Sequence, residues 1–239
     1  MSGSQYIALS GLRARADELD RVATDIANIG TAGYKGERES RAVAERPQFD
    51  AALQTAIDTT FGGKRLDSTD GAITSTGRPL DVAVNGRGFF VVNTSAGDRY
   101  TRNGHFTLDT SRRLVTEDGD PVQGKGGPIT LGPGEVRVDN DGTVWAGDTR
   151  AGQLAVVTVA DPGLMEHDHG TLLSANGQTP TPLENAEVNG GSLEQSNVSV
   201  ADRLAELTSV SRGFEALQKA ISMLMNEVDG KAIDHLGRR

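Results

Sequence analysis

The residues best suited to bind a metal stand together in Glu166-His167-Asp168-His169. Imidazoles two positions apart share a face only on a strand or an extended loop, because side chains alternate there. The local spacing supplies no third ligand for a closed metal site. The other histidines, His105 and His235, are isolated in the sequence. We therefore expect a solvated loop here, with no native metal site and no other cofactor.

Three further patterns suggest chemistry but are better explained as turns. Asp139-Asn140-Asp141-Gly142 begins like a calcium loop, but the twelfth position, which should be a bidentate Glu, is Arg150. Gly86-Arg87-Gly88 and Gly124-Lys125-Gly126-Gly127 lack the residues that complete a phosphate-binding loop. No Gly-x-Ser-x-Gly elbow is present. The sequence thus predicts no catalytic residue, and we expect a protein that is not an enzyme.

Composition excludes other classes of function. The 239 residues include 24 Lys and Arg against 33 Asp and Glu, a net charge of -9. This balance argues against a nucleic-acid binder, which needs clustered basic residues to neutralise phosphates. Cysteine is absent. The first residues lack the basic and apolar parts of a cleavable signal peptide, and no apolar run approaches the roughly 18 residues of a membrane span. We expect a chain without membrane insertion that is soluble, or exported without a cleaved signal.

The N-terminal end has the spacing of an amphipathic helix, which we expect over residues 5–29. Gly30 and Gly33 follow it, as glycines commonly do at helix ends. Its apolar residues alternate in steps of three and four, like the a and d positions of a heptad repeat. They are Leu9, Leu12, Ala16, Leu19, Ala23 and Ile26.

The C-terminal end repeats this pattern in a helix expected to reach about residue 233. Ser196 or Asn197 would cap its start. Val210 and neighbouring leucines widen the apolar stripe beyond what one partner helix covers. An intramolecular helical hairpin is the simple alternative, but the excess stripe favours contact with other chains. We expect the subunit interface at Leu9, Leu12, Leu19, Ile26, Leu204, Leu207, Phe214, Leu217, Ile221, Leu224 and Met225.

The centre of the chain has strand spacing and turn residues. Residues 80–84 alternate apolar and polar side chains, and Asn85-Gly86 predicts a tight hairpin whose return strand is 88–92. Residues 152–159 form the longest strand candidate. A short helix at 51–57 is a further expectation.

The expected fold class is α+β. Long N- and C-terminal helices pair as a coiled-coil domain, with an antiparallel all-β domain inserted between them. The expected segments are an N-terminal helix in 1–35, a connecting arm in 36–75, a β-rich domain in 76–160, a return arm in 161–191 and a C-terminal helix in 192–239.

Three motifs in order resemble one family. Asp25-Ile26-Ala27-Asn28-Ile29-Gly30-Thr31-Ala32-Gly33-Tyr34-Lys35 resembles the N-terminal motif of bacterial flagellar rod and hook proteins. Leu193-Glu194-Gln195-Ser196-Asn197-Val198 resembles the C-terminal signature, and residues 78–92 resemble the start of the β domain. The length is similar to that of the rod proteins, and the opening residues look most like the proximal-rod member. Asp25 departs from the usual Asn of the motif.

The resemblance implies a structural subunit of the proximal rod, polymerising through its terminal helices into a hollow drive shaft that transmits torque and passes exported subunits. It implies partners among copies of itself, neighbouring rod proteins and the type III export apparatus, and a location in the periplasmic basal body. Junction residues would be Asn28, Gly30, Gly33, Tyr34, Lys35, Ser196, Asn197 and Val198. The alternatives are a distal-rod protein of the same family, a periplasmic glycan hydrolase and a trimeric adhesin.

Overall fold

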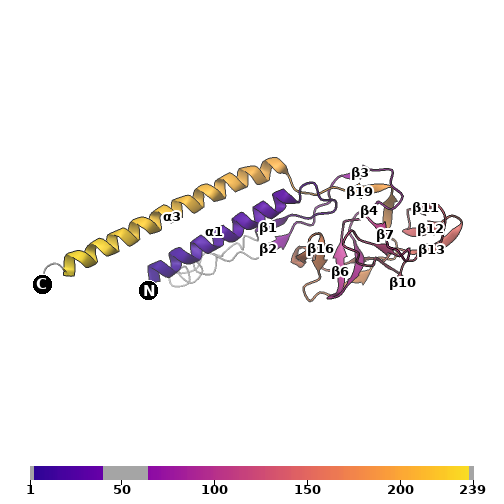
Figure 1. Ribbon diagram of the computed structural model, residues 1–239, viewed down its shortest axis with the longest axis horizontal. Helices are drawn as coiled ribbons and strands as arrows, with labels where there is room; N and C mark the ends of the chain where they lie inside the picture. The colour runs from indigo at the N-terminus through magenta and orange to yellow at the C-terminus, as the bar shows by residue number, and fades with distance from the viewer. Residues whose placement is uncertain (1–2, 40–63, 237–239) are drawn as a thin grey trace. The chain divides into compact units, whose positions relative to one another are not determined.

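The computed structural model describes residues 3–39 and 64–236 (Figure 1). The chain divides into two compact units. The helical unit contains α1 (Gly3–Ala27) and α3 (Val200–Leu236). The β unit contains residues 28–38 and 65–198. In the described part of the chain, neither helix is long and apolar enough to cross a membrane.

The two helices begin and end at local signals. After α1, the chain turns at Asn28, whose carbonyl oxygen accepts a hydrogen bond from the Thr31 amide at 3.0 Å. The start of α3 is capped by Ser199, whose Oγ accepts from the amide of Asp202 at 3.4 Å. The expected cap at Ser196 or Asn197 is therefore wrong, since both residues precede the helix by several positions. A side-chain acceptor at this position satisfies amides that have no partner inside the first turn.

The expected coiled-coil domain is also wrong. A coiled coil buries every a and d side chain along its seam. Among helix side chains that the structure describes, the buried ones are Arg21, Val22, Asp25 and Val210, and two of these four are charged. Leu204, expected in the seam, is 49% exposed. The contact between α1 and α3 thus contains a polar cluster and two buried valines, not a continuous apolar seam.

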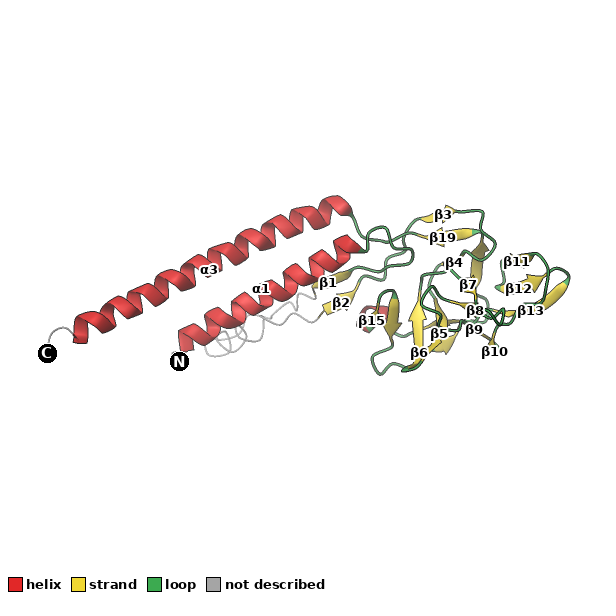
Figure 2. Ribbon diagram, viewed as in Figure 1, coloured by secondary structure: helices red, strands yellow, loops and turns green. Residues whose placement is uncertain are grey.

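The β unit is the expected antiparallel all-β insertion (Figure 2). Its entry and exit carry two-stranded ribbons, one of β1 with β2 and one of β3 with β19. The strands are β1 (Glu37–Glu39), β2 (Lys64–Leu66), β3 (Ile73–Ser75), β4 (Val82–Asn85), β5 (Phe89–Thr94), β6 (Gly97–Thr101), β7 (Thr107–Leu108), β8 (Leu114–Val115), β9 (Gln123–Gly124), β10 (Gly127–Pro128), β11 (Val136–Val138), β12 (Thr143–Ala146), β13 (Thr149–Gln153), β14 (Val156–Thr158), β15 (Glu166–His169), β16 (Leu172–Ser174), β17 (Thr181–Pro182), β18 (Glu187–Gly190) and β19 (Ser192–Glu194). A 3-10 turn at Pro162–Leu164 precedes β15.

A six-stranded sheet in the order β15-β16-β6-β5-β14-β17 divides the core in two. Strand β5 lies inside this sheet and is buried on both faces, which explains its unbroken apolar run. Phe90 joins one apolar cluster with Phe106 and Val144. On the other face, Phe89 packs in a second cluster with Tyr100, Leu173 and other residues.

Two sequence-based strand predictions are corrected by the pairing. Strand β4 does not form a hairpin with β5; it pairs with β18, placing Val84 opposite Val188. The turn at Gly86 exists, with φ +73°, but it carries the chain between different sheets. The long strand expected over 152–159 is split into β13 and β14. The short helix expected at 51–57 lies outside the described residues.

Candidate functional site

Residues from three distant parts of the chain meet inside the β unit. Tyr34 and Lys35 come from the N-terminal motif, Arg102 from the end of β6, and Glu194 and Asn197 from the C-terminal motif. We call these five residues the junction clasp. It ties together the segments by which the chain enters and leaves the β unit.

The carboxylate of Glu194 is the centre of the clasp. Its Oε1 lies 2.6 Å from Lys35 Nζ and accepts the Gly71 amide at 2.8 Å. Its Oε2 accepts from Arg102 Nη1 at 3.0 Å. The side chains of Lys35, Arg102 and Glu194 are between 1% and 3% exposed. Buried charges are tolerated only when they are paired and hydrogen-bonded, and this carboxylate is satisfied on both oxygens.

The two cations of the clasp have further partners. Lys35 Nζ donates to the Thr69 carbonyl oxygen at 2.6 Å. Arg102 Nη2 donates to the Gly86 carbonyl oxygen at 2.6 Å and lies 3.5 Å from Asp70. A guanidinium presents several donors in a fixed plane, so one arginine can hold a turn and a carboxylate together.

Asn197 closes the clasp on the entry side. Its Oδ1 accepts from the Gly36 amide at 2.9 Å. Its Nδ2 donates to the Asp67 and Thr69 carbonyl oxygens at 2.9 and 3.0 Å. One amide side chain therefore joins three backbone segments, a role that needs both a donor and an acceptor.

Tyr34 fixes a residue that the sequence suggested for metal binding. Its ring stacks on the His167 ring with centroids 5.0 Å apart and an interplanar angle of 15°. His167 Nε2 donates to the Lys35 carbonyl oxygen at 2.8 Å, which places the ring proton on Nε2. Across the described residues no group of three or more metal-ligating side chains gathers. The Glu166–His169 segment is a bulged edge strand in this fold.

Gly33 allows the N-terminal motif to reach the clasp. Its φ is +66°, and its amide donates to the Glu194 carbonyl oxygen at 2.8 Å. A Cβ at this position would lie 2.2 Å from the Arg102 carbonyl carbon. Both the dihedral and the backbone contact therefore require glycine.

A second polar cluster lies within the helical unit. Asp25, fully buried, pairs with Arg203 at 2.9 Å, and Arg21 contacts Glu206. This geometry accounts for the acidic residue where the family motif usually has Asn, because α3 supplies an arginine for it. Burial raises the pKa of Glu206, but hydrogen bonds and charge from Arg21 and Arg203 outweigh burial and hold that pKa below its ordinary value.

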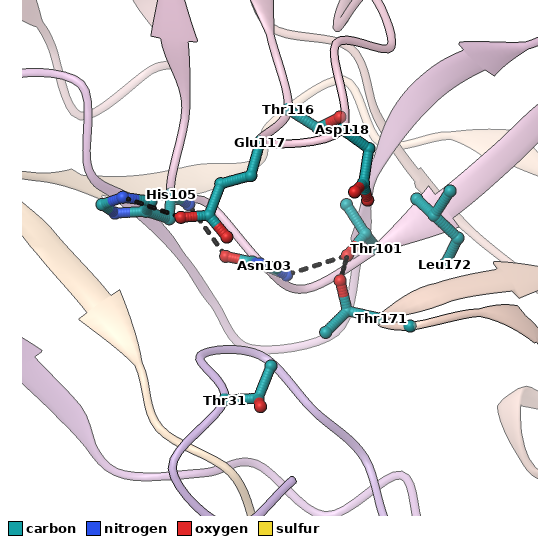
Figure 3. Close-up of a pocket in the computed structure, with 10 residues that line it drawn as sticks. Thr31, Thr101, Asn103, His105, Thr116, Glu117, Asp118, Thr171 and Leu172 are labelled. Carbon is teal, nitrogen blue, oxygen red and sulfur yellow. Dashed lines mark hydrogen bonds and ion pairs between the residues drawn. The ribbon is translucent and has the colours of Figure 1, made fainter.

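Figure 3 shows a polar pocket on the β unit with a volume of about 130 Å³. His105 stands at its wall, with Nδ1 2.9 Å from Asp81 and Nε2 3.4 Å from Glu117. Thr101 and Thr171 share a hydrogen bond of 3.3 Å. Arg78 Nη1 also lies 2.7 Å from His105 Nε2. Nucleophilic catalysis needs a base that bonds the attacking hydroxyl, and the contacts of this ring are to Asp81, Glu117 and Arg78 instead.

The site residues predicted from the sequence are a junction set and an interface set, and the structure treats them differently. Of the junction set, Gly33, Tyr34, Lys35 and Asn197 converge at the clasp, while the Asn28 side chain accepts a hydrogen bond from Thr31. Ser196 Oγ accepts the Val198 amide at 3.2 Å, Gly30 is exposed beyond the end of α1, and neither contributes to the clasp.

The predicted interface residues are only partly covered within the single chain. Leu204 is exposed, and the other members whose side chains are described are half-buried. These are Leu12, Leu19, Ile26, Leu207, Phe214, Leu217 and Ile221. The side chains of Leu9, Leu224 and Met225 lie outside the description.

Sequence reasoning missed several residues that matter most. Arg102 and the ion pair between Asp25 and Arg203 carry no local signal, because their partners are 92 and 178 positions away. Val22, fully buried, falls outside the three-four stripe. A buried-charge argument could have drawn attention to Glu194, since it stands in a family motif directly after Leu193.

The fold and the clasp define a class of chain in which an all-β unit is inserted between two terminal helices and its entry and exit are locked by buried charges. Residues 83–146 match the model described as "Flagellar hook protein FlgE/F/G D1 domain". Residues 189–233 match "Flagellar basal body rod FlgEFG protein C-terminal".

Full-length relatives carry the same description. The chain is 34% identical to flagellar basal-body rod protein FlgF of Caulobacter vibrioides, with 100% of this chain and 99% of the relative covered. It is 32% identical to FlgF of Escherichia coli, over 93% of this chain and 94% of the relative. It is 30% identical to rod protein FlgG of Bacillus subtilis, over 93% and 95%. The chain belongs to the flagellar basal-body rod protein family.

Proposed function

We propose that the chain is a structural subunit of the proximal rod of the flagellar basal body. The relatives named FlgF, aligned over almost their whole length, support this assignment. The observation that carries the mechanism is that the single chain covers the apolar side chains of α1 and α3 only in part, with Leu204 49% exposed. Exposed apolar surface of this kind marks a place where other proteins bind.

In this proposal, copies of the chain and neighbouring rod proteins cover that surface. The contacts are made by Leu9, Leu12, Leu19, Ile26, Leu204, Leu207, Phe214, Leu217, Ile221, Leu224 and Met225. Closely packed apolar side chains resist sliding, since protein interiors are as dense as organic crystals. Helices held in this way transmit torque from subunit to subunit.

The junction clasp gives the β unit a rigid base under load. Force that enters through either arm reaches Glu194, which Lys35 and Arg102 hold from two sides. A carboxylate buried between two cations resists displacement, because separating the charges exposes each of them without a partner. The clasp therefore acts as a structural joint and needs no reacting substrate.

Passage through the type III export apparatus is part of the same proposal. A chain without cysteine forms no disulfide that would oppose threading in the unfolded state. The distal-rod alternative is favoured by one observation, the similarity to FlgG of Bacillus subtilis over most of both chains. The glycan-hydrolase alternative gains no support, because the matching family models and relatives are rod and hook proteins.

The test is complementation of a strain that lacks this protein. Leu207→Asp places a carboxylate on the apolar face of α3, where a covered position offers it no partner. We expect the variant to fold and to be exported. We expect at most about a hundredth of the wild-type number of motile cells, because burying an unpaired charge at the interface costs several kcal/mol.

The matched control is Ser209→Asp, which introduces the same carboxylate at an exposed polar position of α3. This control should swim normally. Normal swimming of Leu207→Asp, with the protein recovered in purified basal bodies, would refute the interface.

A further inference from the structure

Strand β3 is an unprotected edge of the β unit. It pairs with β19 alone among the described strands, and Figure 2 shows β19 between β3 and β4. Every residue from Ala72 to Pro79 is exposed, and Ile73 is 41% exposed. An exposed edge of this kind offers unpaired backbone groups to another strand.

The hydrogen-bond register shows which backbone groups are available. The Thr76 amide donates to Gly191 and the Gln195 amide donates to Ala72, so the even-numbered residues of β3 face β19. In an antiparallel ladder the alternate residues turn their amide and carbonyl groups the other way. Ile73 and Ser75 therefore present their backbone N–H and C=O to solvent.

The other long sheets protect their edges by the usual means. In the six-stranded sheet, β17 contains Pro182, and β15 is charged and bulged between His167 and His169. In the three-stranded sheet, the edge strands β11 and β13 carry Arg137 and Arg150. By contrast, residues 71–77 contain no charge and no proline. The β3 edge lacks these devices that block pairing.

We propose that β3 is a docking edge for β3 of a second copy of this chain, in an antiparallel pair related by a twofold axis. The axis passes between the two Thr74 residues, so Ile73 of each copy lies opposite Ser75 of the other. Both residues present their backbone groups outward, and the pair forms about four inter-strand hydrogen bonds. The two Thr74 side chains meet at a non-hydrogen-bonded position, where Cα atoms lie about 4.5 Å apart.

Charge supports this occupant and this direction. Asp70 precedes the uncharged stretch and Arg78 follows it. Within the chain Asp70 lies 3.5 Å from Arg102, and Arg78 lies 3.5 Å from Asp81, yet the side chains of Asp70 and Arg78 remain 55% and 45% exposed. An antiparallel copy brings the acidic end of each segment to the basic end of the other. A parallel copy would place like charges together, which is unfavourable.

The proposed dimer forms between subunits that are not assembled into a rod. A twofold contact uses the same patch on both chains and closes on itself, whereas a rod that grows in one direction needs head-to-tail contacts. Such a small interface is weak and reversible, as expected for a contact that covers an aggregation-prone edge and is released on assembly. The inference does not depend on the rod assignment.

Cross-linking the purified full-length chain tests the pair directly, because the natural sequence has no cysteine. Thr74→Cys should form a disulfide-linked dimer under mild oxidation, since the expected Cα separation lies near the range of about 4.4–6.8 Å that a disulfide needs. Ser95→Cys, at an exposed turn residue, is the control. We expect the disulfide-linked dimer to form at least about tenfold faster from the Thr74→Cys chain than from the Ser95→Cys chain, because the twofold axis brings the two cysteines at position 74 together.

Charge at the axis gives a second, independent test. Thr74→Lys and Thr74→Glu each place like charges opposite one another, so each variant alone should lose concentration-dependent association in sedimentation. Mixed in equal amounts, they should form a heterodimer. Equal cross-linking at 74 and 95, or no heterodimer in the mixture while wild type associates, would overturn the pairing. A wild-type chain that stays monomeric at all concentrations, with no cross-link at 74, would overturn it too.

Discussion

At the scale of the residue, Glu194 has the most specific environment in the protein. It is buried, receives two cations and a backbone amide, and stands opposite Ile73 in the β3–β19 ribbon. Its backbone carbonyl also accepts the Gly33 amide. A single residue therefore connects the N-terminal motif, β6 and the C-terminal motif.

Glu194→Gln should reduce the free energy of unfolding by about 3–5 kcal/mol, because it leaves Lys35 and Arg102 buried without a counter-charge. Chemical denaturation of the purified chain measures this loss. The control Glu187→Gln removes an exposed carboxylate on β18 that accepts a hydrogen bond from Asn85, and should cost less than about 1 kcal/mol. Comparable losses in the two variants would contradict the clasp.

Gly33→Ala should be far more destabilising than Gly86→Ala. Both positions have positive φ, at +66° and +73°, so each substitution carries about 1–2 kcal/mol of backbone strain. Only at Gly33 does the added Cβ collide with backbone, 2.2 Å from Arg102, whereas nothing lies within 4 Å at Gly86. Thermal unfolding of both variants gives the comparison, and equal melting temperatures would show that the clasp can relax around a side chain.

At the scale of the element, the helices meet through charge. Asp25 and Arg21 of α1 face Arg203 and Glu206 of α3. Among the helix side chains that the structure describes, the buried apolar ones are Val22 and Val210. Ion pairs depend on pH and salt, unlike an apolar seam. The association of the two helices is therefore sensitive to pH and salt.

Acid should weaken the contact between α1 and α3. The pKa of Glu206 is lowered in the folded state, so its contribution to stability is present above the ordinary glutamate pKa of about 4.3. That contribution disappears as the pH falls through the lower folded-state pKa. Carboxyl titration by NMR should place the Glu206 midpoint below the ordinary value, and Arg21→Gln should move it upward. A midpoint unchanged by Arg21→Gln would refute the assigned cause.

At the scale of the whole molecule, the boundary between the units falls within the N-terminal motif. Residues 28–38 belong to the β unit, although 1–35 reads in the sequence as one helical segment. Removing 1–27 should leave the cooperative melt of the β unit intact. Removing 1–35 also deletes Tyr34 and Lys35, and should lower the melting temperature by several degrees, about 4–8 °C for each kcal/mol lost in a small domain. Identical melting temperatures of the two truncated chains would show that the clasp does not stabilise the β unit.

The sequence alone determined the features that depend on local pattern. The three-four spacing of leucines gave the two helices, and Asn-Gly and Asp-Gly pairs located turns of an inserted β unit. The motifs at both ends identified the family, because the order of residue types in a motif can be compared between chains without knowledge of the tertiary contacts.

Only the tertiary structure decided which distant residues meet. Strand β4 pairs with β18, about a hundred residues away, and Lys35 pairs with Glu194, 159 positions away. Local pattern cannot choose among strands of similar composition, since each satisfies the same period. The choice depends on which arrangement buries the most apolar surface while leaving each buried charge with a partner. The polar contact between α1 and α3, in place of the coiled coil that the heptad pattern suggested, follows from the same requirement at Asp25 and Arg203.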